Sequence, residues 1–232
     1  MEQPVALYEA FDKSKIAALP RVQFTGRIVV VNTAASARRA VDVLLRQPII
    51  GIDTETRPSF KKGLNHKVAL LQAATRNICF LFRLNKIGTP DCLLRLLADK
   101  RQLKVGLSLK DDRHMLHERA DFEDGRFVDL QDYVRQFGIV DMSLQKLFAN
   151  VFGKRISKGA QLTNWEAADL TERQQRYAAT DAWACVLLYE RLEQLKHSGN
   201  YLMIPRVSYE HLLEQVVKDL LNQLAWCRKE QY

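Results

Sequence analysis

The sequence predicts a single-domain α/β protein in which helices flank a mixed β-sheet. Three β-rich segments follow one another at 49–55, 67–74 and 77–84 with short connections, which favours an antiparallel meander. Helical and strand patterns then alternate along the rest of the chain, which is typical of βα units. The 232 residues, of which 47% are hydrophobic, suffice for one sizeable core.

The N-terminal residues 1–26 are expected to form a helical extension. Apolar residues at helical spacing predict a short helix over 7–19. The β-rich run at 27–31 predicts an edge strand or a second strand of the sheet. Thr33 or Ser36 can cap the helix that follows, because a hydroxyl at the cap accepts a bond from a free backbone N–H.

The run Ile49–Glu55 predicts the central strand. Its apolar part does not alternate with polar residues, which is typical of a strand buried on both faces. Residues two apart on a strand point to the same face, so Asp53 and Glu55 should be neighbours. Two adjacent carboxylates repel, and a divalent cation such as Mg²⁺ or Mn²⁺ would compensate their charge. The alternative is a strand end with two solvated acids.

A polar loop at 56–66 follows the central strand. Its Lys61 and Lys62 could contact phosphate if the strand end binds metal, or they could simply be solvated. Strands at 67–74 and 77–84 are expected to form a hairpin and complete the meander.

Two further acids, Asp111 and Asp112, follow a predicted strand at 103–107. Sites in open α/β sheets form at the carboxyl ends of strands, so these acids are candidates for the same site. The alternative is that they cap the next helix. In this region we expect a strand at 126–130 and helices at 91–97, 108–120 and 143–152, with another ending at 137.

The strongest helical pattern covers 172–195 and begins at Thr171 or Asp169. Tyr177 and Asp181 lie four residues apart in it, so they share one face. An acid on the inward side of an apolar helix needs a partner, either a metal ion or an arginine.

A basic stretch with glycines, at 153–163, precedes this helix. Its Lys154, Arg155 and Lys158 are candidates to hold a phosphate backbone. Trp165 follows the stretch and could either stack on a base or fill the core.

The overall composition favours a polyanionic partner. The net charge is +8 and the isoelectric point is near 9.4, although a basic surface could also simply favour solubility. No signal-peptide core and no apolar run long enough for a membrane is expected, so the prediction is a cytoplasmic protein. The cysteines show no CxxC spacing and are expected to be reduced thiols: Cys79, Cys92, Cys185 and Cys227.

Taken together, these segments resemble the DEDDy 3′–5′ exonucleases, which have the ribonuclease H-like (DnaQ-like exonuclease) fold. The nearer branch is the exonuclease domain of the Werner syndrome protein, and ribonuclease D is more distant. The resemblance covers roughly 29–195. The matching motifs are IDTET at 52–56, VGLSLKDDRHML at 105–116 and LTNWEAADLTERQQRYAATDA at 162–182, and KVALLQ at 67–72 resembles the family's second strand.

The resemblance implies hydrolysis of phosphodiester bonds at single-stranded or recessed 3′ ends of DNA or RNA, with release of nucleoside 5′-monophosphates. It implies two ions, Mg²⁺ or Mn²⁺, with Asp53 bridging them and Tyr177 orienting the attacking water. Glu55 and Asp181 would share one ion, and Asp112 would support the other, partly through water.

The second-motif acid is ambiguous because Asp111 and Asp112 are adjacent. The family spacing from Ser108 and to Leu116 favours Asp112, and Asp111 is the reserve. Arg113 departs from the family pattern, which usually has an apolar residue there.

Other functions remain open on the sequence alone. They are a nucleic-acid-binding module without turnover, an endonuclease of the same broad fold, a scaffold protein, and an RNA-specific enzyme like ribonuclease D. The exonuclease domain is expected at 27–196. The C-terminal extension at 197–232 is expected to be helical, and its apolar stripe could pack on the domain or mediate self-association: Leu212, Leu213, Val216, Val217, Leu220, Leu221 and Leu224.

Overall fold

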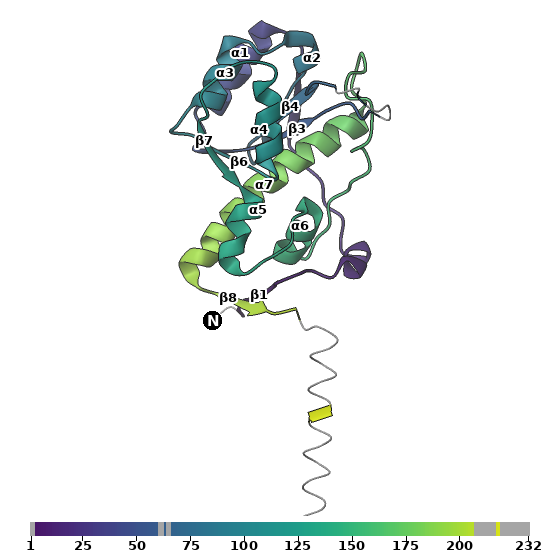
Figure 1. The fold of residues 1–232 in the computed structure, drawn as a ribbon, viewed down its shortest axis with the longest axis vertical. Coiled ribbons are helices and arrows are strands. Elements are labelled where there is room, and N and C mark those ends of the chain that lie inside the picture. Colours follow the sequence, from purple (N-terminus) through teal and green to yellow (C-terminus); the bar gives the residue numbers. More distant parts are fainter. Residues whose placement is uncertain (1–2, 60–62, 64–65, 207–216, 219–232) are drawn as a thin grey trace, which may run out of the picture.

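The computed structural model describes residues 3–59, 63, 66–206 and 217–218. In this part of the chain, six strands form one mixed sheet in the order β2-β5-β4-β3-β6-β7, and two strands form a small separate sheet (Figure 1). The large sheet contains β2 (Arg27–Val31), β3 (Ile49–Glu55), β4 (Leu70–Ala74), β5 (Ile78–Phe82), β6 (Leu103–Gly106) and β7 (Arg126–Asp129), and the small one contains β1 (Val5–Tyr8) and β8 (Tyr201–Ile204).

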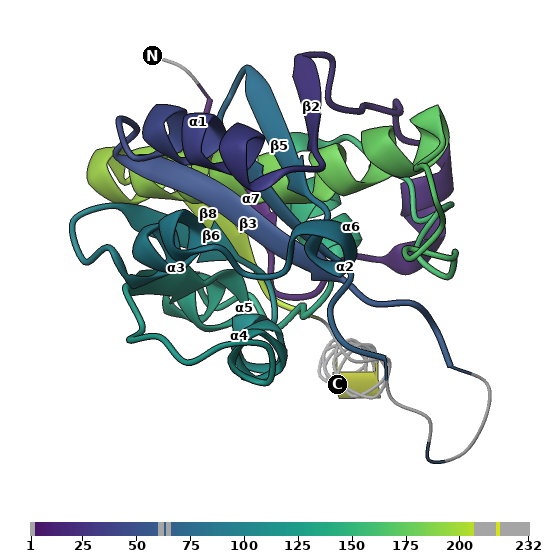
Figure 2. The same ribbon diagram turned by 90° about the horizontal axis from the view of Figure 1, so that it is seen from above.

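The predicted antiparallel meander is confirmed. β4 runs antiparallel to both β3 and β5, and in this register Asp53 lies opposite Gln72. β3, β6 and β7 run parallel to one another, so their carboxyl ends meet at one edge of the sheet. At the other side of the sheet β2 pairs with β5 in parallel, and Figure 2 shows the two strands next to each other. The sheet therefore brings the end of β3 close to the segments that follow β6 and β7.

Two of the main helices begin at caps that the sequence predicts, and a third begins at a serine cap. Thr33 forms a reciprocal capping box with Ser36, Thr171 does the same with Gln174, and Ser143 caps the helix after it. The helices are α1 (Ala34–Leu44), α2 (Leu84–Ile87), α3 (Asp91–Ala98), α4 (Leu109–His117), α5 (Leu130–Tyr133), α6 (Leu144–Phe152) and α7 (Glu172–Ser198), with 3₁₀-helices at Lys13–Ala18 and Val134–Phe137.

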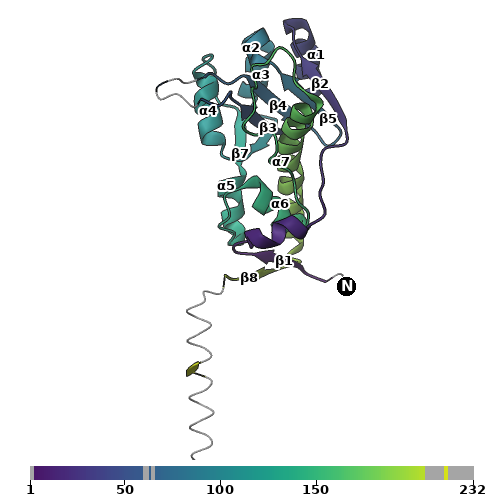
Figure 3. The same ribbon diagram turned by 90° about the vertical axis from the view of Figure 1, so that its right-hand side faces the viewer.

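Helices cover both faces of the sheet. One face packs against α1, α3 and α4. The long helix α7 crosses the other face and contacts five strands of the sheet, from β2 to β6. Its small residues Ala178, Ala179 and Ala182 are buried there, and α6 packs beside it. Figure 3 shows the N-terminal 3₁₀-helix next to α6. Among the described residues, no helix combines the length and hydrophobicity needed to cross a bilayer.

The backbone of α7 comes very close to β3 at Gly51. A Cβ atom on Gly51 would lie 1.8 Å from the carbonyl oxygen of Ala182 and 2.9 Å from Cγ2 of Val186. Only glycine leaves room for this approach, because a backbone carbonyl cannot move aside as a side-chain end can. Asp53 lies two residues after Gly51, and Asp181 comes directly before Ala182. The contact between Gly51 and Ala182 therefore brings Asp53 and Asp181 close to each other.

The prediction of a helix over 7–19 is wrong. Residues 5–8 form β1, which pairs in parallel with β8, and a 3₁₀-helix capped by Asp12 follows. The partner strand lies at the other end of the sequence, so local periodicity could not reveal the pairing.

The C-terminal extension differs from the helical prediction at 199–204, whereas the two described residues further on, 217–218, are helical. α7 ends at Ser198, Gly199 adopts a left-handed conformation, and 201–204 is the strand β8 rather than a helix. The predicted apolar stripe, apart from Val217, and Cys227 lie outside the described residues.

The Gly51 contact leads to a stability prediction. Gly51→Ala should lower the free energy of unfolding in urea by about 1–3 kcal/mol or more, because the methyl group must separate β3 from α7. Gly159→Ala is the matched control, since its nearest neighbour is the flexible end of Arg173 at 2.8 Å. The control should change stability by no more than about 0.5 kcal/mol. Equal losses in the two variants would contradict the proposed role of the contact.

Candidate active site

Three carboxylates meet where β3 leaves the core. Asp53 and Glu55 come from β3 and Asp181 comes from α7, and an oxygen of each lies within 4.8 Å of the others. We call these three residues the acidic cluster. Glu55 and Asp181 are each only 8% exposed. The structure thus brings Asp181 next to two acids that lie more than 120 positions earlier in the sequence.

Asp112 lies beside the acidic cluster but not within it. The Thr54 hydroxyl donates a hydrogen bond to the Asp112 carboxylate. The charge of Asp112 also raises the pKa of Asp53, although less than burial does. Asp111, the alternative from the sequence, is exposed. The structure therefore places Asp112 rather than Asp111 next to the cluster.

Burial and mutual repulsion hold protons on these acids. Burial first, and then the charges of Asp181 and Asp112, raise the pKa of Glu55 to about 9. The pKa of Asp53 lies well above its usual range for the same reasons. Burial raises the pKa of Asp181 to about 7 and that of Asp112 to about 6. An array of carboxylates that resists ionisation without a counter-charge is suited to binding a cation.

Tyr177 faces the acidic cluster from one turn earlier on α7. Its hydroxyl lies close enough to the Asp181 carboxylate for the two groups to shift each other's pKa. Burial and the neighbouring acids raise the pKa of Tyr177 far above its usual value, so the hydroxyl stays protonated and acts as a donor. The ring packs against Trp165, with 6.1 Å between ring centroids. The hydroxyl is thus held in one place by a packed ring.

Asp129 is a residue of this region that the sequence interpretation missed. It ends β7, and its carboxylate accepts hydrogen bonds from the backbone N–H groups of Ser108 at 3.0 Å and Leu109 at 2.7 Å. Ser108 has a φ of 63°, the left-handed region, so the turn before α4 needs such support. The clamp orients the start of α4, which carries Asp112. An acid at the end of the strand next to β6 was the available signal.

A cavity of about 350 Å³ opens in front of the cluster, which we call the acidic cavity. The acidic cluster, Tyr177 and Lys158 line it. Lys158 is exposed, and its charge partly offsets the burial that raises the pKa of Asp181. A phosphate in the cavity would therefore meet at least one cationic side chain.

The other basic residues that the sequence singled out have different positions. Lys61 and Lys62 lie outside the described residues. Lys154 is exposed. Arg155 is partly buried, and its Nε donates a hydrogen bond to the carbonyl oxygen of Leu19 at 2.9 Å. Their role in binding nucleic acid stays a prediction.

The base-stacking interpretation of Trp165 requires correction. The side chain is 0% exposed, and its indole N–H donates to the carbonyl oxygen of Gln161 at 3.3 Å. A ring without exposed surface cannot stack on a base. Trp165 belongs to the core that supports Tyr177.

Several known proteins are similar to this chain in sequence. A family model described as 3′–5′ exonuclease matches residues 28–197. The mouse bifunctional 3′–5′ exonuclease/ATP-dependent helicase WRN is 29% identical over 217 residues, which cover 89% of this chain and 15% of that protein. An Arabidopsis thaliana 3′–5′ exonuclease is 31% identical over 206 residues, covering 81% of this chain and 72% of that protein.

The fold itself is shared with a solved exoribonuclease. The crystal structure of Escherichia coli RNase D superposes with a TM-score of 0.66 and 20% sequence identity. The match covers 75% of this chain and 46% of that one. At this identity the likeness concerns the fold alone.

The raised pKa values predict how stability depends on pH. The folded state binds more protons than the unfolded state between the ordinary carboxyl pKa of about 4 and the folded pKa of Glu55, about 9. The acidic cluster therefore contributes most to stability at the low end of this window, and the contribution is lost as pH rises. Without metal ions, the melting temperature should fall between pH 6 and pH 8.5, and Mn²⁺ should raise it more at pH 8.5.

Asp53→Asn provides the control for this measurement. It removes one of the interacting acids, so both the pH slope and the Mn²⁺ effect should shrink. A pH slope that is identical in the wild type and in Asp53→Asn would show that the cluster does not cause it.

Proposed function

The chain belongs to the 3′–5′ exonuclease family, and from this premise we propose that it removes nucleotides from single-stranded or recessed 3′ ends of DNA or RNA in a metal-dependent reaction. The products would be nucleoside 5′-monophosphates. The observation that carries the proposal is the acidic cluster with the Tyr177 hydroxyl beside it. The chain spans only 15% of the mouse relative's length.

The donor set of the cluster fits a divalent cation. Its ligand atoms are carboxylate oxygens, which suit Mg²⁺ and Mn²⁺, and binding would relieve the repulsion that raises the pKa values. Asp53, Glu55 and Asp181 would hold the ions, and Asp112 would support them from beside the cluster. When bound, two such cations stabilise the charge that develops on the attacking and leaving oxygens of a phosphodiester.

The protein's own groups then have to position the reactants. The Tyr177 hydroxyl, placed beside Asp181 by the packing of its ring, would hold the attacking water in line with the phosphorus. Its raised pKa excludes a role as a strong base near neutral pH. Thr54 would keep Asp112 in place by donating a hydrogen bond to its carboxylate. Asp129 would do so indirectly, by fixing the start of α4, which carries Asp112. Lys158 would contact the phosphate.

Asp53 and Asp112 should matter far more than Asp111 for the cleavage rate. On a 5′-labelled oligonucleotide with Mg²⁺, Asp53→Asn and Asp112→Asn should each lose at least about 100-fold in rate, equal to about 2.7 kcal/mol in the barrier. Asp111→Asn is the matched control, because the same charge is removed one residue away on the exposed side, and it should stay within about twofold. Denaturant melts should show all three variants folded, with Asp53→Asn no less stable because repulsion is relieved.

A comparison of linear and circular substrates in the same assay tests whether degradation starts from a 3′ end. The wild type should shorten the labelled strand one nucleotide at a time and leave a closed circle intact. Cleavage of the circle would favour an endonuclease instead. Full activity of Asp53→Asn would remove the acidic cluster from the mechanism.

Tyr177→Phe isolates the hydroxyl, because the ring and its packing on Trp165 remain. We expect the rate to fall roughly 10- to 1000-fold, or about 1.4–4 kcal/mol in the barrier, since the attacking water loses its alignment. Mn²⁺ affinity, measured by calorimetry, should change little because no ligand carboxylate is removed. A wild-type rate on both DNA and RNA would identify Tyr177 as a core residue only.

A further inference from the structure

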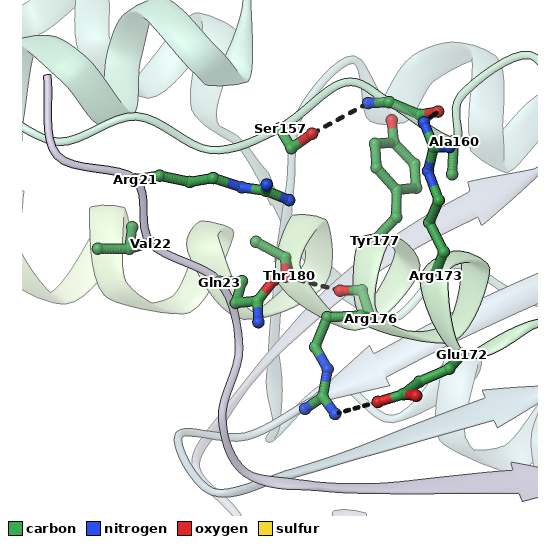
Figure 4. Close-up of a pocket in the computed structure, with 11 residues that line it drawn as sticks. Arg21, Val22, Gln23, Ser157, Ala160, Glu172, Arg173, Arg176, Tyr177 and Thr180 are labelled. Atoms are coloured by element: carbon green, nitrogen blue, oxygen red, sulfur yellow. Dashed lines mark hydrogen bonds and ion pairs between the residues drawn. The ribbon is translucent and has the colours of Figure 1, made fainter. Parts of the chain in front are cut away.

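A second cavity, of about 310 Å³, adjoins the acidic cavity. Tyr177 and Ser157 line both cavities, so they form the wall that the two share. Three arginines, Arg21, Arg173 and Arg176, line the second cavity, and we call it the arginine pocket (Figure 4). Its charge is opposite to that of the cavity on the other side of Tyr177.

The arginines are only partly neutralised within the protein. Arg176 donates to the carbonyl oxygen of Phe24 at 3.1 Å and pairs with the Glu172 carboxylate at 3.4 Å. Arg173 donates to the carbonyl oxygen of Gly159, which is not a charged partner. In the described part of the chain, the Arg21 guanidinium has no hydrogen-bond or ion-pair partner, and Figure 4 shows it reaching across the pocket toward α7. Three positive charges thus face one carboxylate.

The N-terminal wall of the pocket is held to the domain by hydrogen bonds. The Phe24 N–H donates to Thr180 Oγ1 at 3.0 Å, which attaches the segment to α7. The Val22 N–H donates to the carbonyl oxygen of Arg155 at 2.9 Å. Arg21 lies between these anchors and Leu19, which accepts a bond from the Arg155 side chain. The backbone of Arg21 is therefore positioned, although its side chain has no partner.

We propose that the arginine pocket binds a backbone phosphate of the nucleic-acid strand whose 3′ end occupies the acidic cavity. The inference rests on the proposed function, because that function supplies the polyanion. A strand whose end lies at the carboxylates needs cationic groups for its other phosphates, and this pocket lies directly across Tyr177. Guanidinium groups match the geometry of phosphate oxygens and remain charged at all relevant pH values. Arg21 precedes the residues 28–197 that match the family model, so the N-terminal segment adds this contact to the domain.

The test compares two substrates that share one scissile bond type. A thymidine dinucleotide with a free 5′-hydroxyl contains a single phosphodiester, whereas a thymidine decamer has further phosphates along the strand. In the double variant Arg21→Ala/Arg173→Ala, KM for the decamer should rise about tenfold with kcat within twofold. The salt dependence of kcat/KM for the decamer should become shallower by about one unit in the log–log slope. KM and kcat for the dinucleotide should remain unchanged.

Two control variants make this comparison specific. Arg39→Ala removes an exposed arginine from α1, on the opposite face of the sheet, and should leave both substrates unaffected. Arg21→Lys/Arg173→Lys keeps the charge and should recover most of the decamer affinity. Arg21 and Arg173 are exposed, so melting curves should confirm that the alanine variant is folded.

The outcomes separate the inference from the proposed function. Equal KM changes on both substrates, or no change on either, would overturn the inference while the exonuclease proposal stands. Thymidine 5′-monophosphate is also tested as an inhibitor of decamer cleavage. If the Arg21→Ala/Arg173→Ala variant loses this inhibition while its KM for the decamer is unchanged, the pocket binds the phosphate of a free nucleotide, and the inference is again overturned. Failure of the wild type to cleave either substrate would instead contradict the proposed function.

Discussion

The close approach of α7 to β3 at Gly51 is the constraint on which the site depends. The Ala182 carbonyl oxygen occupies the space that a side chain at Gly51 would need. This contact sets the distance between a strand and a helix that are encoded at opposite ends of the domain. Asp53 and Asp181 lie next to the contact on either side, so the geometry of the acidic cluster follows from backbone packing rather than from any attraction between the acids.

The same packing creates an electrostatic cost. Carboxylates that are buried together raise one another's pKa values, and Lys158, which lines the cavity and is exposed, offsets only part of this. The surrounding structure holds the acids in place: the Thr54 hydroxyl holds Asp112, and Asp129 supports the strained turn at Ser108. Such an arrangement is stable only because the sheet and its two layers of helices fix it, and it favours any cation that can enter.

Local patterns in the sequence predicted the parts of the structure that depend on local physics. The unbroken apolar run before Asp53 predicted the buried central strand, and the caps at Thr33 and Thr171 predicted where helices begin. Features that depend on distant partners were not predictable: the β1–β8 pairing, the choice between base stacking and core filling for Trp165, and the hydrogen bonds from the turn at Ser108 to Asp129. The arginine pocket is of this second kind, because Arg21 and Arg173 are brought together only by the folded N-terminal segment.

A cation that binds the acidic cluster should displace protons from its carboxylates. Calorimetric titration of Mn²⁺ into metal-free protein at pH 7, in two buffers with different ionisation enthalpies, measures the protons released on binding. With the pKa of Glu55 at about 9 and that of Asp181 at about 7, we expect release of more than one proton per chain at pH 7, declining toward pH 9. Binding heats that do not depend on the buffer would contradict this expectation. So would a wild-type affinity for Mn²⁺ no higher than that of the Asp53→Asn variant.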